Sequence, residues 1–508
     1  MLFNSLHYLI FFPVVVALYF TTPHRFRWLL LLVASCYFYM VFIPEYILVL
    51  AVTICVDYFA AIAMEKSEGL RRKRLFLAGI AINLGMLAIF KYFNFVNSNL
   101  AGLAEMLGWN YPIENLAILL PIGLSFHTFQ SISYLIEVYN ERQPAERHFG
   151  YLSLFVMFFP QLVAGPIERP QYMLPQLKVE QGFNYDRIAD GLKWMTWGMF
   201  KKVVVADGLA ALVNPIFASP HNYAGPAFAF AAFAFAIQIY CDFSGYSDIA
   251  LGSAQVLGIR LSRNFRHPYF SKSIAEFWQR WHITLSSWFR DYVFFPLRRS
   301  LLQRKNRLPD WATRAIPTLV TMFLSGLWHG ANWTFILWGL LHGMYIAIWE
   351  SMDALFKKRA SPPSRTWSAV AGGFSMAVTF SLVSLALVIF RAQSITDAGY
   401  MLGNIFNGWD SFSTPLLAGF NGAIPLSDGV FTALESITSV SRGSILLMGV
   451  SLAILLFVEI KQEMGDFLSE INALHPIVRL LSYSSAIVII LGLGMYNTAE
   501  QVFIYFQF

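Results

Sequence analysis

Apolar runs that are long enough to cross a membrane recur along the whole chain, and they restrict its possible folds more than any other feature. AIVIILGLGMY (486–496), for example, lies in a run whose length suits ~30 Å of hydrocarbon. Hydrophobic residues occupy 57% of the 508 positions and charged residues only 13%, against roughly 25% charged residues in soluble domains. We therefore exclude a soluble protein and predict an all-α polytopic integral membrane protein, in which each spanning helix satisfies its own backbone groups.

The basic segments predict which loops face the cytoplasm. The first span, expected at about residues 7–20, has no positive segment before it, so we predict that it is retained rather than cleaved as a signal peptide. HRFR (24–27) and EKSEGLRRKR (65–74) are separated by two expected spans and therefore lie on the same side, which the positive-inside rule makes the cytoplasmic side. The same rule places three later segments there: 140–148, 260–307 and 357–365. These assignments predict about twelve transmembrane helices with both chain ends outside.

We expect one membrane domain over residues 1–508, with three parts. N-terminal helices occupy 1–150, a central core occupies 151–352, and C-terminal helices occupy 353–508. Within the last part, a segment at about 391–442 has few basic residues and many Gly, Ser, Pro and Asn, which predicts an external loop.

Two apolar segments do not match the pattern of a simple spanning helix. Residues 151–177 are interrupted by four prolines and a glycine, and residues 271–299 alternate Trp and Phe with Arg, Glu and Asp. We predict that both are re-entrant or interfacial pieces, because irregular backbone at membrane depth must be covered by protein or line a water-filled cavity.

Four histidines of the central core are candidates for chemistry. His329 lies in SGLWHGANW (325–333), at the end of an apolar run. A neutral imidazole costs less in a membrane than a permanent charge and exchanges a proton near neutral pH, which favours a general base over the alternative, a structural histidine bonded to a neighbouring helix. His282 either shares this chemistry or is an interfacial residue of an amphipathic aromatic stretch. We interpret His342 as a packing residue and His267 as a loop residue.

The neighbours of His329 offer several polar groups. Asn332 would share a helix face with His329 if that helix continued, and it could then orient the imidazole or bind a carbonyl group. Asn332 and the hydroxyl of Ser325 are also candidates to stabilise a developing oxyanion. Gly326 and Gly330 favour a close backbone approach, which suits either helix packing or a ligand.

Asp242 and Asp248 lie in IYCDFSGYSDIALG (239–252), which we expect to break a membrane segment. They could form a cation site or a proton relay, but we favour buried ion pairs with Arg280 or Arg290.

The remaining polar features narrow the possible ligands. The basic stretch from 260 to 307 would attract anionic membrane lipids or a phosphate-bearing ligand such as coenzyme A. The formal net charge of +6 is interpreted as a topology signal, so no nucleic-acid partner is expected. Cys36, Cys55 and Cys241 have no metal-ligand spacing, so we expect neither a metal site nor a disulfide framework.

Five segments resemble the membrane-bound O-acyltransferase superfamily, and within it the bacterial alginate O-acetylation branch. Tryptophan-histidine motifs are their most specific parts, and the match runs in order from the first span to about residue 400. The segments are FFPQLVAGPIERP, YCDFSGYSDIALG, EFWQRWHITLSSWFRDYVFFPL, SGLWHGANWTFILWGLLHG and VIFRAQS.

The resemblance implies a ring of helices around a central tunnel in a bacterial inner membrane, with periplasmic chain ends. It makes His329 the essential buried histidine and His282 the second histidine, 47 positions upstream (329 minus 282). It also implies acetyl-coenzyme A as the cytoplasmic donor, with no permanently bound cofactor, an extracytoplasmic alginate-like exopolysaccharide as acceptor, and a separate periplasmic acetyltransferase as partner. Our candidate substrate-binding residues are Asn332, Ser325, Trp328, Gln279, Arg280, Asp242 and Tyr246.

Two other functions are open at this point. One is transfer of a D-alanyl or longer acyl group to another cell-envelope polymer. The other is a transporter or export subunit without covalent chemistry, which would predict polar residues along several spans and an inverted repeat. The polar groups here are instead concentrated between residues 239 and 333.

Overall fold

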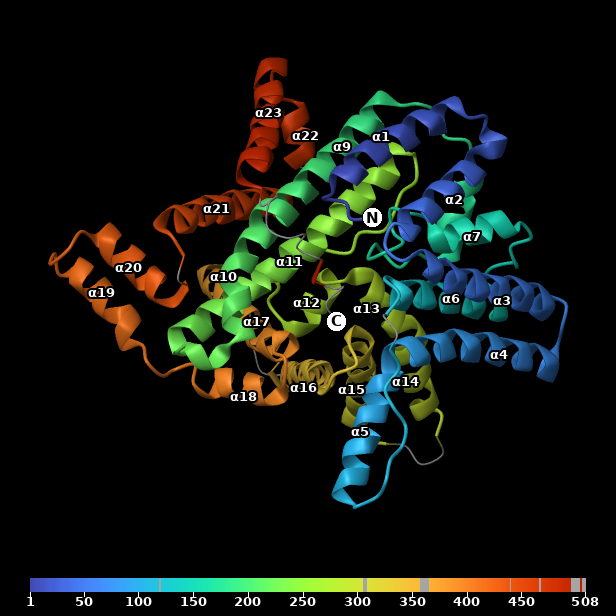
Figure 1. Ribbon diagram of the computed structural model, residues 1–508, viewed down its shortest axis with the longest axis horizontal. Coiled ribbons are helices and arrows are strands. Elements are labelled where there is room, and N and C mark those ends of the chain that lie inside the picture. The colour runs from blue at the N-terminus through green and yellow to red at the C-terminus, as the bar shows by residue number, and fades with distance from the viewer. Residues whose placement is uncertain are drawn as a thin grey trace. The chain divides into compact units, whose positions relative to one another are not determined.

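The computed structural model describes residues 1–117, 120–304, 308–356, 365–438, 440–465, 467–494 and 503–504. Every regular element in these ranges is a helix (Figure 1), which confirms the predicted all-α class. The chain divides into two compact units, one made of Met1–Trp197 and Tyr246–Arg263 and the other of Gly198–Gly245 and Asn264–Phe508. The predicted ring, its tunnel and the three-part division of the chain stay predictions.

Seven helices of the described ranges are long and apolar enough to span a membrane, so the chain is a multi-pass membrane protein. A shorter apolar helix, α1 (Leu6–Thr21), lies where the first span is predicted. The predicted count of about twelve is not confirmed by this number, and the basic segment at 357–365 lies mostly outside the described residues. The seven spans are Pro44–Glu65, Gly69–Met106, Gly225–Val256, Trp333–Met352, Val370–Arg391, Arg442–Met464 and Pro476–Leu493.

The first unit is built mainly from the N-terminal helices. These are α1, α2 (His24–Met40), α3 (Ile47–Glu65), α4 (Gly69–Leu87), α5 (Phe93–Met106), α6 (Leu124–Tyr139), α7 (Phe149–Met157), α8 (Pro170–Lys178) and most of α9 (Tyr185–Met199), together with the end of α11 (Gly225–Val256).

The predicted break within residues 151–177 is confirmed in this unit. The α7 helix ends at Met157, and irregular backbone continues to α8. Polar side chains satisfy part of this backbone, since Ser35 Oγ accepts from the Phe159 N–H over 3.0 Å and Gln161 Nε2 donates to the Phe155 carbonyl over 2.8 Å. The irregular segment is thus buried in protein, as hydrocarbon would require, and its depth in the membrane stays a prediction.

The second unit contains the histidine segments and the C-terminal helices. A π-helix over Phe200–Ala206 leads into it from α9. Its α-helices are α10 (Asp207–Ala218), most of α11, α12 (Ile274–Arg280), α13 (Ile283–Phe289), α14 (Phe295–Leu302), α15 (Asp310–His329), α16 (Trp333–Phe356), α17 (Arg365–Arg391), α18 (Ile395–Gly403), α19 (Asp410–Phe420), α20 (Leu426–Thr438), α21 (Arg442–Met464), α22 (Phe467–Asn472) and α23 (Pro476–Leu493).

A tight hairpin of α15 and α16 is the element that positions His329. A Cβ atom on Gly326 would lie 2.3 Å from the carbonyl oxygen of Phe335, and a Cβ atom on Gly339 would lie 2.3 Å from that of Met322. Only glycine permits this approach of two helix backbones. Gly326 therefore serves helix packing rather than ligand binding.

One local expectation is wrong. The α11 helix runs without a break through Asp242 and Asp248, because the segment contains no helix-breaking proline and the charge of Asp242 is paired. In residues 271–299 several large aromatic side chains, such as Trp278 and Trp281, are buried, and the re-entrant or interfacial character of this segment stays a prediction. The segment at 391–442 contains α18, α19 and α20, and its external location stays a prediction.

Candidate active site

An aromatic cage surrounds His329, the last residue of α15. Its side chain is 4% exposed. The imidazole centroid lies 5.0 Å from the Trp328 ring, 5.1 Å from the Trp338 ring and 5.4 Å from the Phe390 ring, each at a steep angle. These rings belong to α15, α16 and α17, so three helices shelter one weakly basic side chain from bulk water.

A very small cavity adjoins this cage. The space open to the centre of a water molecule is about 10 Å³, which is close to the minimum for one ordered water or one oxygen atom. An acyl carrier could enter only after the surrounding rings move. The cavity is lined by Ile239, Phe277, Trp281, His329, Trp338, His342, Val383, Leu387 and Phe390.

His342, which we interpreted as a packing residue, is fully buried and lines the same cavity. Its Nδ1 accepts a hydrogen bond of 3.3 Å from the indole N–H of Trp278. A neutral imidazole that accepts at Nδ1 carries its proton on Nε2, so His342 presents an N–H donor at Nε2. No sequence signal indicated this role, because α12 and α16 meet only through tertiary packing.

His282 lies between α12 and α13 and is fully buried within the protein. Its backbone is left-handed, with φ 43° and ψ 53°, which is strained for a residue other than glycine. Burial lowers the pKa of this imidazole to about 3, so the ring is neutral at physiological pH. The His282 ring lies 4.7 Å from the Phe243 ring and 5.8 Å from that of Trp328.

Trp328 therefore contacts both histidines that the sequence singled out. Its ring lies 5.8 Å from that of His282 and 5.0 Å from that of His329. The structure thus brings together three of the predicted site residues around one indole, although they come from two separate segments of the sequence.

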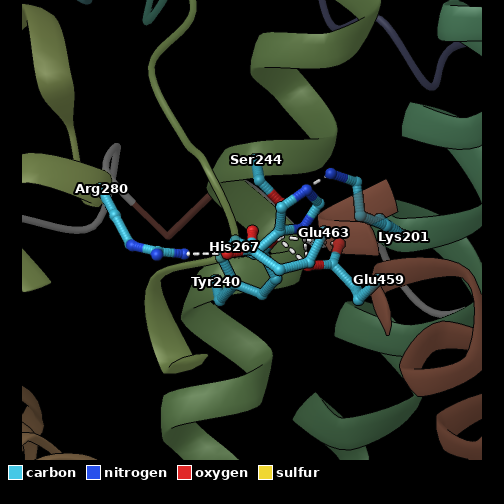
Figure 2. Close-up of polar contacts among 7 residues, drawn as sticks. All are labelled: Lys201, Tyr240, Ser244, His267, Arg280, Glu459 and Glu463. Carbon is cyan, nitrogen blue, oxygen red and sulfur yellow. Dashed lines mark hydrogen bonds and ion pairs between the residues drawn. The ribbon is translucent and has the colours of Figure 1, made fainter. Parts of the chain in front are cut away.

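Acidic residues of α21 hold the segment that precedes His282. The hydroxyl of Tyr240 donates to both carboxylate oxygens of Glu459, at 2.9 and 2.8 Å, and Nδ1 of His267 lies 2.6 Å from the same carboxylate. One helical turn later, Glu463 forms a 2.8 Å ion pair with Arg280 at the end of α12. Figure 2 shows these contacts, which we call the α21 clamp.

The ion pairs that we expected for Arg280 and Arg290 are wrong. Arg280 pairs with Glu463 and, at 2.9 Å, with Glu276 rather than with an aspartate of α11. Arg290 pairs with its neighbour Asp291 at 2.9 Å. Sequence reasoning missed the α21 clamp, because α21 follows the part of the chain that carries the recognisable motifs.

Asp242 belongs to a buried ionic cluster. One of its oxygens lies 2.6 Å from Nζ of Lys202, and the other accepts a 2.9 Å bond from the backbone N–H of Ile504. Lys202 also pairs with Asp207 at 2.8 Å. Beside this cluster, Nζ of Lys201 donates to the Ser244 hydroxyl at 2.9 Å, as Figure 2 shows. The predicted ion pair of Asp242 therefore exists, but its partner is Lys202.

Four other candidate substrate-binding residues do not line the cavity beside His329. The α15 helix ends at His329, so Asn332 does not continue it; the Asn332 side chain instead accepts from the Thr334 N–H at 3.0 Å near the start of α16. Ser325 is buried and lines a different, mainly apolar cavity of about 200 Å³. Gln279 is exposed, and Tyr246 lies in the first unit, where it stacks on Phe3 at 4.5 Å. The roles predicted for these four residues stay predictions.

A family model for the membrane-bound O-acyltransferase family matches residues 16–390, which include both tryptophan-histidine motifs. The chain belongs to the membrane-bound O-acyltransferase family. It is therefore an acyltransferase, and the resemblance inferred from the motifs is confirmed. Glu459 and Glu463 of the α21 clamp lie beyond the matched residues, whereas the cage of His329 lies inside them.

Curated relatives of this acyltransferase are named for three different polymers: alginate, peptidoglycan and teichoic acid. The chain is 38% identical over 430 residues to the probable alginate O-acetylase AlgI of Pseudomonas aeruginosa, covering 83% of this chain and 77% of that protein. It is 34% identical to the peptidoglycan O-acetyltransferase of Helicobacter pylori, with 73% and 72% covered. It is 28% identical to the teichoic acid D-alanyltransferase of Bacillus subtilis, with 56% and 71% covered.

No group of three or more His, Cys, Asp or Glu side chains within the described part of this acyltransferase is arranged to hold a metal ion.

Proposed function

We propose that this acyltransferase takes an acetyl group from cytoplasmic acetyl-coenzyme A and delivers it for O-acetylation of an extracytoplasmic, alginate-like polysaccharide. A periplasmic acetyltransferase is the expected partner, and the bacterial inner membrane, with both chain ends periplasmic, is the expected location. The observation that carries the proposal is the sheltered imidazole of His329 beside an oxygen-sized cavity. The relatives named as O-acetylating enzymes support the acetyl group.

His329 is proposed as the general base of the transfer. Its ring takes the proton of the acceptor hydroxyl while the hydroxyl oxygen attacks the thioester carbonyl. The carbon–sulfur bond then breaks, and the imidazolium returns the proton to the departing thiolate. In the alternative route, His329 itself attacks the thioester and is transiently acylated before the acceptor removes the acetyl group. Both routes need a base that is neutral before the reaction and shielded from water, which would otherwise hydrolyse the thioester.

Trp338 and His342 are proposed to stabilise the oxyanion. Among the described residues, neither the indole N–H of Trp338 nor Nε2 of His342 has a hydrogen-bond partner. A buried donor without a partner costs about 1–3 kcal/mol, so an oxygen atom is the favoured occupant of a cavity lined by both rings. Asn332 and Ser325 are the alternative donors.

Reconstitution tests the function as a whole. The purified chain in nanodiscs, with radiolabelled acetyl-coenzyme A, the periplasmic partner and polysaccharide, should transfer label to the polymer. Absence of both thioester turnover and transfer would instead favour a transporter or export subunit. The similarity to a D-alanyltransferase makes D-alanyl the alternative acyl group. Competition between acetyl and D-alanyl donors in the same assay shows which of the two groups the enzyme transfers.

A further inference from the structure

A large basic cavity lies in the first unit. Its volume is about 440 Å³, which is within the range of ~300–1,000 Å³ typical of small-molecule sites. Its walls come from α8, α9, the end of α11 and the loop that follows α11. The lining residues that carry the argument are Arg187, Asp190, Trp194, Arg260 and Arg263.

The charges of this cavity favour an anionic ligand. Three arginines line it, Arg187, Arg260 and Arg263, against one acidic residue, Asp190. That carboxylate forms a 2.7 Å ion pair with Lys193, one turn along α9. The three arginine charges are therefore not offset within the wall, and the sequence places the loop of Arg260 on the expected cytoplasmic side.

Two of the arginines are held in place. The guanidinium carbon of Arg263 lies 5.2 Å from the centre of the Trp194 ring, a cation–π distance. An N–H of Arg187 donates to the carbonyl of Gly182 at 2.7 Å. Arginines that are already oriented lose less side-chain entropy when they bind an anion, which increases affinity.

The loop that carries Arg260 and Arg263 is also held by hydrogen bonds from neighbouring side chains. The Gln176 side chain accepts from the Arg260 N–H at 2.9 Å and donates to the Arg260 carbonyl at 3.1 Å. The hydroxyl of Ser262 donates to the buried carboxylate of Glu168 at 3.0 Å. Gly258 lies at the start of this loop with φ 89°, a backbone conformation that favours glycine. A Cβ atom at this position would also lie 2.7 Å from the Gln181 side chain.

We propose that this cavity binds a phosphate-bearing ligand through Arg187, Arg260 and Arg263. Arginine matches phosphate oxygens with two parallel N–H bonds, and several arginines around one cavity suit a pyrophosphate or a phosphodiester. The phosphate belongs either to the nucleotide end of the acyl donor or to an anionic lipid headgroup. Only the first of these two sources rests on the proposed function.

Binding is tested on the full chain in phosphatidylcholine nanodiscs, with adenosine 3′,5′-bisphosphate as the probe. Calorimetric titration of the double variant Arg187→Gln/Arg263→Gln should show affinity at least about tenfold weaker than wild type, because charge-assisted bonds are lost. The matched control is Arg25→Gln, which changes an exposed arginine at the start of α2 on the same expected side, and it should bind as wild type does. Equal affinity in all three proteins, or no binding to wild type, overturns the proposal.

Kinetics and lipid binding distinguish the two sources. If the donor occupies the cavity, the double variant raises KM for acetyl-coenzyme A about tenfold with kcat retained, whereas KM for acetyl-pantetheine, which lacks the phosphates, stays unchanged. If a lipid headgroup occupies it, KM for both donors is unchanged and native mass spectrometry shows loss of bound phosphatidylglycerol. Wild type that binds the probe but transfers no acetyl group would refute the proposed function and leave this site intact.

Discussion

The indole N–H of Trp278 donates to Nδ1 of His342 over 3.3 Å, and this bond selects the tautomer of a buried histidine beside His329. Trp278 also lines the apolar cavity of about 200 Å³ that contains Ser325, whereas His342 lines the oxygen-sized cavity of His329. The bond therefore joins the walls of two cavities. Movement of Trp278 would break this bond and release the His342 tautomer.

Replacing Trp278 with phenylalanine should lower kcat about tenfold, because the His342 ring loses the donor that holds its proton on Nε2. KM for the donor should change little. The steady-state rates of acetyl transfer provide the measurement, with Trp333→Phe, whose ring is 52% exposed, as the control. A Trp278→Phe enzyme with wild-type kcat would show that the tautomer of His342 does not matter.

His329→Ala should abolish acetyl transfer while the protein still inserts and folds, since loss of a general base typically costs about 10²–10⁴ in rate. Size-exclusion chromatography and thermal unfolding in nanodiscs establish that the variant is folded. His221→Ala, at a largely exposed position, is the matched control. If a folded His329→Ala protein still transfers acetyl groups, His329 has only a packing role.

The pKa of His282 predicts how stability depends on pH. Its folded-state value of about 3 lies below the unfolded value near 6.5, so the unfolded chain binds a proton that the native chain does not. Stability linked to His282 is therefore fully present above pH 6.5 and falls by up to about 1.4 kcal/mol per pH unit as the pH decreases toward 3. Melting temperatures of wild type and His282→Gln between pH 7.5 and 4.5 should show a smaller slope for the variant.

His282→Ala should also weaken acetyl transfer severely at pH 7.5. A His282→Gln protein whose melting temperature depends on pH as steeply as that of wild type would contradict the buried, neutral state of His282. A surviving fraction of activity would assign His282 to positioning rather than to proton transfer.

Glu463→Gln should lower kcat by roughly threefold to tenfold, because the α21 clamp holds Arg280 through a charge-assisted bond and Arg280 lies two residues before His282. Glu470→Gln, which removes an exposed partner of Lys461 on the neighbouring helix, is the control. Rescue by Glu463→Asp, measured as kcat at constant KM, would separate positioning from general loss of folding. If Glu463→Gln and Glu470→Gln have the same kcat, the α21 clamp does not contribute to catalysis.

Asp242→Asn should destabilise the protein by about 3–5 kcal/mol, because the buried ammonium of Lys202 loses one of its two carboxylate partners. The triple variant Asp242→Asn/Lys202→Met/Asp207→Asn removes all three charges of the cluster and should recover part of that loss. Thermal unfolding of the two variants provides the comparison. A stable Asp242→Asn protein with a raised KM would instead support the predicted substrate-binding role.

The sequence by itself determined the class of this protein and its most conspicuous chemical groups. The length of each apolar run can be read from the local sequence. Comparison of that length with the thickness of the bilayer shows which runs can form spanning helices. The motifs around His282 and His329 are contiguous in the sequence, so their resemblance to the acyltransferase family can be recognised from the sequence alone. The break after Met157 was predictable because proline and glycine act on their immediate neighbours.

Only the tertiary structure decided which partners these groups have. Trp278 and His342 are 64 positions apart, and Arg280 and Glu463 are 183 positions apart. The partner of Asp242 was predicted wrongly for the same reason, since several cations were available and the sequence does not rank them. Hydrophobic pattern sets how long a helix is and which groups must be buried, but the pairing of buried polar groups depends on distances of a few ångströms that packing alone defines.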